Sequence, residues 1–315
     1  MPSSARFSPS SSDHRRGLGW ALSSAVGGAV MVVPWKLANE VGDPSHSVLL
    51  LLAVAALANS VLVVGQRLFV AGPELRIGGT EIWAGVLLAV LTLLGNHVSA
   101  VAIQDLSPAL LSVLLRADVI FVAVFAWLFL GERIERRFWF GAMIAGIGLV
   151  VLQGPMGDAG VLGFFGGGTG LAVVAAIAFS LMAIVTRRFI HRIDPVAVNA
   201  IRLWLAVAFW FPFNEFPHFS EIPRDQILFA TIAAIAGPFL GRIALMMSAR
   251  HVEARVSTLA SLAAPVLTLV LAFWVLSDWP GYHELIGSAI MIAGISVSLV
   301  RGPPARLSPG RGRRA

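Results

Sequence analysis

The sequence contains no cysteine, a single lysine and a single tyrosine. The absence of cysteine excludes disulfides, thiolate metal sites and cysteine nucleophiles. Charged side chains are also scarce: they make up 13% of the 315 residues, whereas an ordinary soluble domain carries about 25%. Hydrophobic residues make up 57%. A soluble core cannot bury so much apolar surface, so the composition indicates an all-α membrane protein that crosses the bilayer many times.

Long apolar runs separated by short polar gaps define the expected spans, because a helix needs roughly 20 apolar residues to cross a bilayer. We predict ten helices, at residues 17–38, 46–65, 81–103, 107–130, 137–153, 166–187, 195–213, 226–248, 255–277 and 284–300. Residues 1–16 and 301–315 are rich in Ser, Pro, Gly and Arg, and we expect disordered basic tails there. The N-terminal tail and the first run resemble a signal peptide, but no clear cleavage site follows, so we expect the first span to be retained.

Arginine outside the spans is concentrated in alternate gaps. The two tails and the gaps GERIERR (131–137) and HRIDP (191–195) are rich in it, whereas the opposite gaps hold only Arg224, with Lys36 at a helix end. Cytoplasmic loops of membrane proteins are enriched in Arg and Lys. We therefore predict a multi-pass protein of the cell membrane, the inner membrane in a bacterium, with both termini in the cytoplasm. This distribution also accounts for the net charge of +6 without a nucleic-acid partner.

A weak internal repeat relates the two halves of the chain at an offset of 146 residues. The offset aligns Gly141 with Gly287, Gly148 with Gly294, Gly95 with Gly241, and LGE (130–132) with LSD (276–278). Because five is an odd number, a repeat of five helices re-enters the membrane upside down. Inverted repeats are frequent in secondary transporters, where the substrate site lies near the mid-plane between the halves.

The segment SPALLSVLLRADVIFVAVFAWLFLGERI (107–134), followed by FWFGAMIAGIGLVVL (138–152), resembles the EamA-type hallmark of the drug/metabolite transporter superfamily. In the second copy LSDW replaces the usual L-G-E, and Pro265 lies where the family often has a mid-helix proline, whereas the first copy has Val119. The resemblance implies ten transmembrane helices in two inverted five-helix repeats, residues 17–153 and 166–300. It further implies a cavity lined mainly by helices 1–4 and 6–9. The implied function is a secondary active transporter, an exporter of a small polar metabolite or toxic compound that works by alternating access.

Polar residues inside or at the ends of the spans are the candidate cavity or gate residues. They are Lys36, Asn96, His97, Arg116, Asp118, Arg202 and Arg242. A charge in hydrocarbon costs roughly 2.5–3.5 kcal/mol and persists only where it faces protein or water. Arg116 and Asp118 lie about 200° apart around a helix, so each needs its own partner. Either at least one of them borders the substrate path, or both are structural.

The other candidates fall into two predicted polar layers. We expect Lys36, Asn96 and His97 to face the outside, with an inner counterpart at Arg242, which the offset aligns with Asn96, and at Arg187. His97 is the candidate for a proton-coupled step, because histidine titrates near neutral pH; a hydrogen-bonded structural histidine is the alternative. Lys36 is either an outer gate or substrate-carboxylate contact, or a cation that extends to the membrane surface. Arg202 either has a functional role or extends its side chain to the inner surface. Pro238 is expected to kink the eighth span.

Apart from Glu81 and Glu284, which are the first residues of their spans, Asp118 is the single acid within the spans, and the cations outnumber it, which favours an anionic or zwitterionic substrate. The seven histidines are scattered and no HExxH motif is present, so we expect neither an enzyme nor a metal or other cofactor. A passive channel stays open as an alternative because a cavity does not reveal coupling, and a membrane-embedded enzyme is the other alternative. The expected partners are a small-molecule substrate and the lipid bilayer, with a homodimer left open.

Overall fold

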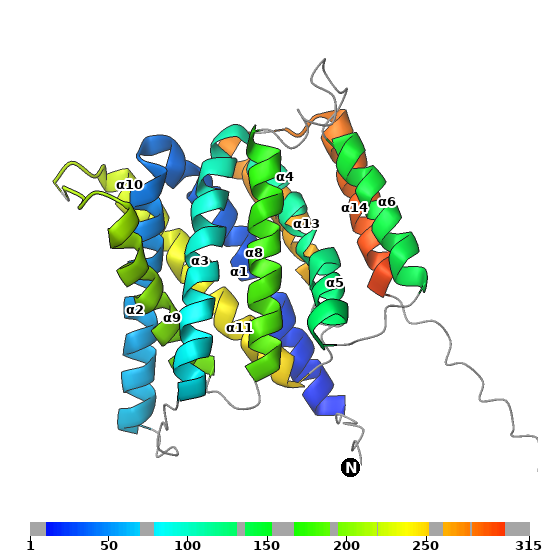
Figure 1. Cartoon of the computed structure of the whole chain (residues 1–315). Coiled ribbons are helices and arrows are strands. Elements are labelled where there is room, and N and C mark those ends of the chain that lie inside the picture. Colours follow the sequence, from blue (N-terminus) through cyan, green and yellow to red (C-terminus); the bar gives the residue numbers. More distant parts are fainter. Residues whose placement is uncertain are drawn as a thin grey trace, which may run out of the picture.

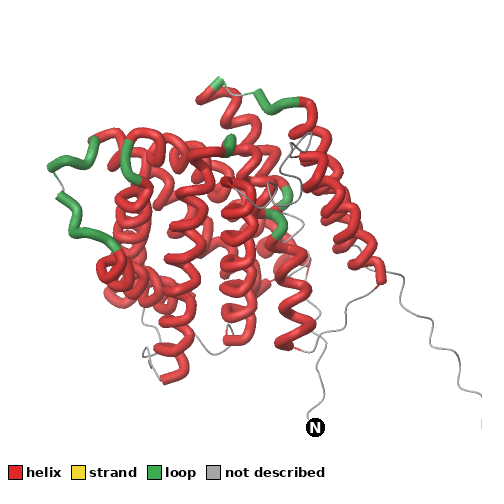
Figure 2. Tube along the Cα trace, turned by 45° about the horizontal axis from the view of Figure 1, so that its top comes forward, coloured by secondary structure: helices red, strands yellow, loops and turns green. Residues whose placement is uncertain are grey.

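The structure is a computed structural model that describes residues 11–69, 79–130, 136–152, 167–189, 195–218, 220–251, 261–277 and 279–299. These residues form helices and short connections, with no strand among them (Figures 1 and 2). The predicted C-terminal tail and residues 1–10 lie outside them. The prediction of a disordered tail up to residue 16 is wrong in its last part, because the first helix begins at Ser11.

Every predicted span contains a described helix. The first half holds α1 (Ser11–Val41), α2 (Pro44–Phe69), α3 (Gly79–Asp105), α4 (Pro108–Leu115), α5 (Asp118–Leu130) and α6 (Arg136–Leu152). The second half holds α8 (Gly167–Phe189), α9 (Pro195–Trp210), the 3-10 turn η1 (Phe211–Phe213), α10 (Arg224–Ala234), the π-helical η2 (Ile235–Gly241), α11 (Arg242–His251), α13 (Ala263–Leu276) and α14 (Tyr282–Leu299). Three predicted spans are interrupted among the described residues: the fourth is α4 and α5, the eighth is α10, η2 and α11, and the ninth has a turn at Leu262 before α13.

The helices present a lipid-compatible surface. Among the described residues, seven helical segments are long and apolar enough to cross a membrane, and α6, α13 and α14 are shorter apolar helices. Large apolar side chains are exposed on their outer faces, as at Leu57, Val61, Val64 and Leu68 along α2. Soluble proteins rarely expose apolar patches of this extent. The chain is a multi-pass membrane protein, and the count of ten spans stays a prediction.

The first helices of the two halves run in opposite directions. Lys36, near the end of α1, donates a hydrogen bond of 2.8 Å to the carbonyl of Ile103 near the end of α3. Gly168, at the start of α8, packs so closely on that end of α3 that an added Cβ would lie 2.8 Å from the carbonyl oxygen of Ala102. The end of α1 and the start of α8 therefore meet the same end of α3. The second half is upside down relative to the first.

The packing of α6 against α14 obeys the same offset of 146 residues. A Cβ added to Gly148 of α6 would lie 2.8 Å from the carbonyl oxygen of Gly287 in α14, and one added to Gly294 of α14 would lie 2.7 Å from that of Gly141 in α6. The offset turns Gly148 into Gly294 and Gly287 into Gly141, so the two contacts are equivalent under the repeat. The pair lies at one edge of the bundle (Figure 1). Small residues allow such close approach of helices in membranes.

The end of α13, where LSD replaces LGE, places a residue other than glycine in the left-handed backbone region. Ser277 ends α13 with φ of 53°, in the left-handed region, and its N–H donates to the carbonyl of Phe273 (3.1 Å). The repeat aligns Ser277 with Gly131 of the LGE sequence. Glycine adopts this backbone conformation without strain, which explains why glycine suits this position.

We predict that Gly148→Ala lowers the free energy of unfolding by about 1–3 kcal/mol, because the methyl group must displace the facing backbone of α14. Gly294→Ala should have a similar effect by symmetry. The measurement is thermal or denaturant unfolding of the purified protein in detergent. Gly146→Ala on the same helix is the matched control, because its added Cβ meets no atom within 4 Å. Equal unfolding temperatures for the Gly146 and Gly148 variants would contradict the packing.

Candidate functional site

The fourth predicted span breaks where its charges lie. The N–H groups of Arg116 and Ala117 donate to the carbonyls of Val113 (2.9 Å) and Leu114 (3.0 Å), three residues back instead of four. This tight turn separates α4 from α5. The prediction of one continuous helix over 107–130 is therefore wrong at this point. At 1.5 Å per residue the break lies roughly 12 Å along the span from its first helical residue, within the membrane.

The second half has a break at the aligned position. Ser261 is helical, Leu262 is a turn residue, and α13 begins at Ala263, which is 146 residues after Ala117. The two breaks touch, because an Nη of Arg116 donates a hydrogen bond of 3.3 Å to the Oγ of Ser261. Nearby, the hydroxyl of Thr268 in α13 donates to that of Ser112 in α4 (3.3 Å). Two interrupted helices, one from each repeat, thus cross through polar contacts.

Asp118 begins α5 on the other side of the break. Its backbone carbonyl accepts a hydrogen bond from the Oγ of Ser180 in α8 (3.0 Å), whereas its carboxylate Oδ1 is buried without a partner. Among the described residues, no ion pair within 4.0 Å joins Asp118 to Arg116. The two residues contact different helices: Arg116 through its side chain and Asp118 through its backbone carbonyl. An unpaired buried carboxylate oxygen is costly, so this group is a candidate for function.

Arg202 lies deep between three helices. Its side chain is only 2% exposed. Its Nε donates to the Oδ1 of Asn199 in α9 (2.7 Å), and an Nη donates to the Oγ1 of Thr92 in α3 (2.7 Å) and lies 3.6 Å from the sulfur of Met182 in α8. The alternative that Arg202 extends to the inner surface is therefore wrong. All the partners of this buried guanidinium in these contacts are neutral groups.

The eighth span passes next to this cluster. Pro238 does disturb the helix as expected, and the disturbance is a π-helical segment, η2, in which the carbonyl of Pro238 accepts a bond from Asn199 (3.4 Å). Gly27 of α1 packs directly on Gly241 of η2, because a Cβ on Gly27 would lie 3.0 Å from the Cα of Gly241. Arg242 follows immediately, and its buried Nε has no partner. The side chain of Arg187, the other predicted inner residue, lies outside the described part.

Asn96 belongs to the Arg202 cluster. It is buried, and its amide donates to the carbonyl of Thr92 one turn earlier (2.7 Å). The neighbouring His97 is half-buried on α3. Lys36 binds α3 at Ile103, which is seven residues or roughly 10 Å beyond Asn96. The predicted outer layer of Lys36, Asn96 and His97 is therefore not formed.

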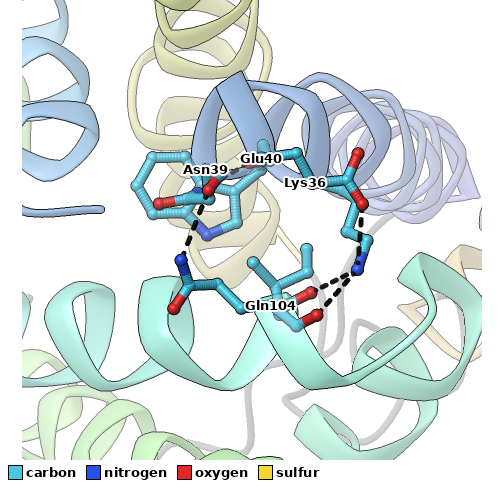
Figure 3. A network of polar contacts seen from close by, with 6 residues as sticks. Lys36, Asn39, Glu40 and Gln104 are labelled. Atoms are coloured by element: carbon cyan, nitrogen blue, oxygen red, sulfur yellow. Dashed lines mark hydrogen bonds and ion pairs between the residues drawn. The ribbon is translucent and has the colours of Figure 1, made fainter. Parts of the chain in front are cut away.

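Lys36 instead caps the end of α3 (Figure 3). Its ammonium donates to the carbonyls of Ile103 (2.8 Å) and Gln104 (3.2 Å) and pairs with Glu40 one turn later in α1 (3.2 Å). The amide of Gln104 in turn donates to the backbone carbonyl of Asn39 (3.4 Å). The last carbonyls of a helix lack intrahelical donors. Lys36 supplies one and joins α1 to α3.

Sequence reasoning did not find the partners of the charges. Thr92 and Met182 are ordinary residues in apolar helices and carry no signal. Asn199 carries a signal that could have been read: it lies three residues before Arg202 and so on the same face of α9. Among the described residues no cluster of three or more acidic or histidine side chains could hold a metal ion. A surface hollow of about 470 Å³ along α8 is apolar, and none of the predicted residues lines it.

We predict that Lys36→Met lowers the free energy of unfolding by about 1–3 kcal/mol, because it leaves carbonyls at the end of α3 without a donor. The matched control is Glu40→Gln, which should change stability by less than about 0.5 kcal/mol because exposed ion pairs contribute little and Glu40 is 48% exposed. Thermal unfolding in detergent measures both. An unchanged unfolding temperature in Lys36→Met, together with weakened solute binding, would favour the gate hypothesis instead.

Comparison with known proteins gives the family. The model of the EamA-like transporter family matches residues 15–153 and 166–300, which is well over half of the chain. No curated protein matches. Among 28 matching chains of solved structures, one described only as the crystal structure of a protein has a TM-score of 0.59 and 19% sequence identity, over 88% of this chain and 98% of that chain. That likeness shows a shared fold. With two matched segments, two inverted halves and an all-helical membrane architecture, the chain belongs to the EamA-like transporter family and is a membrane transporter of the drug/metabolite transporter superfamily.

Proposed function

We propose that this transporter is a secondary active exporter of a small polar metabolite or toxic compound, with ten spans, that moves its substrate by alternating access. One observation carries the proposal: interrupted helices at aligned positions of two inverted halves meet through Arg116 and Ser261. Interrupted helices at the interface of inverted repeats are typical of substrate and ion sites in secondary transporters. At the break in the first repeat the backbone groups stay paired through bonds to carbonyls three residues back, as a membrane interior requires.

The inverted arrangement of the two halves accounts for access that alternates between the two sides of the membrane. When one half adopts the conformation of the other, the packing that closed one side of the membrane is rebuilt on the opposite side. The distribution of arginine favours cytoplasmic termini, and for a bacterial chain the inner membrane. In that orientation the ends of α1 and α3, joined by Lys36, lie on the outer side. Export is the direction that the family resemblance implies.

The test is concentrative flux. Purified protein in proteoliposomes is screened with a panel of labelled amino acids, organic acids and toxic cations under an imposed pH gradient. A secondary active transporter accumulates its substrate above equilibrium, and accumulation collapses when a protonophore removes the gradient. A passive channel only equilibrates the solute, and a membrane-embedded enzyme changes it chemically, which mass spectrometry of the released solute detects. Either of the last two outcomes overturns the proposal.

Two groups are candidates for the coupling proton. His97 is the candidate from the sequence, and it lies half-buried on α3. Asp118 is the candidate that the geometry favours, because its Oδ1 is buried without a partner beside the helix break. A carboxyl group in such a place is less costly when protonated, and it can accept or release a proton when the break moves. We propose Asp118 as the proton-carrying group.

We predict that Asp118→Asn abolishes accumulation driven by a pH gradient while substrate exchange across a membrane without a gradient continues. The amide cannot carry the proton but fills the same space. The measurement is the ratio of gradient-driven uptake to exchange in proteoliposomes. Asp225→Asn is the control, because Asp225 lies exposed in the first turn of α10 and should leave the ratio unchanged. Loss of coupling in His97→Gln instead of Asp118→Asn would contradict the assignment.

The absence of native cysteine permits a direct test of alternation. Ser45 at the start of α2 hydrogen-bonds Asn214 after η1, so this contact joins the first repeat to the second. We predict that the double variant Ser45→Cys and Asn214→Cys loses most of its transport on oxidation and regains it on reduction, because the disulfide holds the two halves together at one side. The single-cysteine variants are the controls and should transport in both conditions. Full transport by the cross-linked protein would contradict movement of the halves at this contact.

A further inference from the structure

Two arginines on contacting helices of the second half have no described counter-charge. Arg202 is 2% exposed, and Arg242 is half-buried with its Nε out of contact with solvent. α9, which carries Arg202, contacts α11, which Arg242 begins, and Asn199 of α9 bonds to the carbonyl of Pro238 one turn before Arg242. Among the described residues, the only ion pair within 4.0 Å joins Lys36 to Glu40, so no described carboxylate pairs with either guanidinium.

The hydrogen bonds of this pair leave donors free. Arg202 uses its Nε and one Nη on Asn199, Thr92 and Met182, and its other Nη has no partner among the described residues. Arg242 makes no side-chain hydrogen bond to a described residue, and its Nε is buried. A guanidinium has five donors and no acceptor. The neutral partners therefore orient Arg202 without neutralising it, and two like charges share a medium of low dielectric constant, which is costly.

The pair lies between equivalent positions of the two repeats. Thr92 and Pro238 are 146 residues apart, and α9 contacts both of them: Arg202 bonds to the hydroxyl of Thr92, and Asn199 bonds to the carbonyl of Pro238. Arg242 lies one turn after Pro238, as Asn96 lies one turn after Thr92. The cluster is thus close to the axis that relates the inverted halves. Substrates of inverted-repeat transporters bind near such an axis.

We propose that Arg202 and Arg242 form an oxyanion-binding site and that the transported substrate carries a carboxylate or phosphate group bound there. This inference rests on the proposed function. A guanidinium binds an oxyanion through two parallel charge-assisted hydrogen bonds, and such a group would use the free donors and compensate the repulsion. The two arginines would then hold the charged end of the substrate between α9 and α11, next to Asn96 and Thr92.

The experiment is an equilibrium binding measurement on the full chain in detergent. Thermal unfolding is followed during titration with sodium acetate, sodium succinate and inorganic phosphate, with choline chloride as the cationic probe and sodium chloride to keep ionic strength constant. We expect a saturable rise in unfolding temperature with at least one oxyanion and none with choline. A response to acetate or succinate assigns a carboxylate substrate, and a response to phosphate alone assigns a phosphate ester. No saturable rise with any of the three oxyanions overturns the proposal.

Variants separate binding from a structural role. Arg202→Gln and Arg242→Met should weaken oxyanion binding by roughly tenfold or more, the loss expected for one charge-assisted bond. Arg188→Gln on the exposed surface of α8 removes the same charge and should bind as the wild type does. Arg242→Met should unfold at the same or a higher temperature than the wild type without anion, because it removes a repelled charge; a structural arginine would give the opposite result. Oxyanion binding by Arg242→Met equal to that of the wild type overturns the proposal even if Arg202→Gln does not fold.

The outcome is independent of the flux experiment. Accumulation of a neutral or cationic solute that Arg242→Met leaves unaffected would overturn the oxyanion site and leave the transporter proposal intact. Oxyanion binding without any gradient-driven accumulation would support the oxyanion site and overturn the proposal of secondary active transport.

Discussion

A charge inside hydrocarbon must be met by a polar group, and this constraint organises the interior of the protein. The hydrophobic effect does little to join one apolar helix to another within a bilayer. Three of the cations within the spans therefore act as specific contacts between helices. Lys36 joins α1 to the carbonyls that end α3, Arg202 joins α9 to α3 and α8, and Arg116 joins the break in the first repeat to Ser261 in the second. Small residues such as Gly148 bring the remaining helices close enough for dispersion forces to hold them.

The repeat explains the scaffold, and departures from it mark the positions where the halves differ chemically. The glycine contacts of α6 and α14 exchange under the offset of 146 residues. The charges do not: Arg116 aligns with Leu262, Arg242 with Asn96, and Lys36 with Met182. Two identical inverted halves would give inward-facing and outward-facing states of equal free energy. Charges placed on one half only make these states unequal, and a ligand or proton can shift their populations only by interacting differently with the two.

The fold was largely predictable from sequence because it depends on long-range periodicity and composition. Runs of apolar residues placed the helices, and glycines in register indicated the repeat whose aligned positions pack in α6 and α14. The helix break at Arg116 was not predictable in this way. Average hydropathy does not change when backbone N–H groups bond to carbonyls three residues back instead of four. The charges of the candidate site could be read from the sequence, but the residues that contact them could not. Thr92 and Met182 are ordinary members of apolar helices, and the depth of Lys36 relative to Asn96 depends on how far α1 is shifted along α3, which no local pattern encodes.

The two polar clusters suit separate roles in the coupled transport that we propose. The Arg116 and Asp118 break lies where one helix from each repeat crosses the other, so movement between the halves changes the surroundings of a carboxyl group with an unpaired oxygen. The Arg202 cluster is held by α3, α8 and α9 through hydrogen bonds that keep the guanidinium in a fixed orientation. α8 contacts both clusters, because Ser180 bonds to the backbone at Asp118 and Met182, on the same helix, lies against Arg202. In the mechanism that we propose, a shift of α8 would alter both sites together and so link the proton to the substrate without direct contact between them.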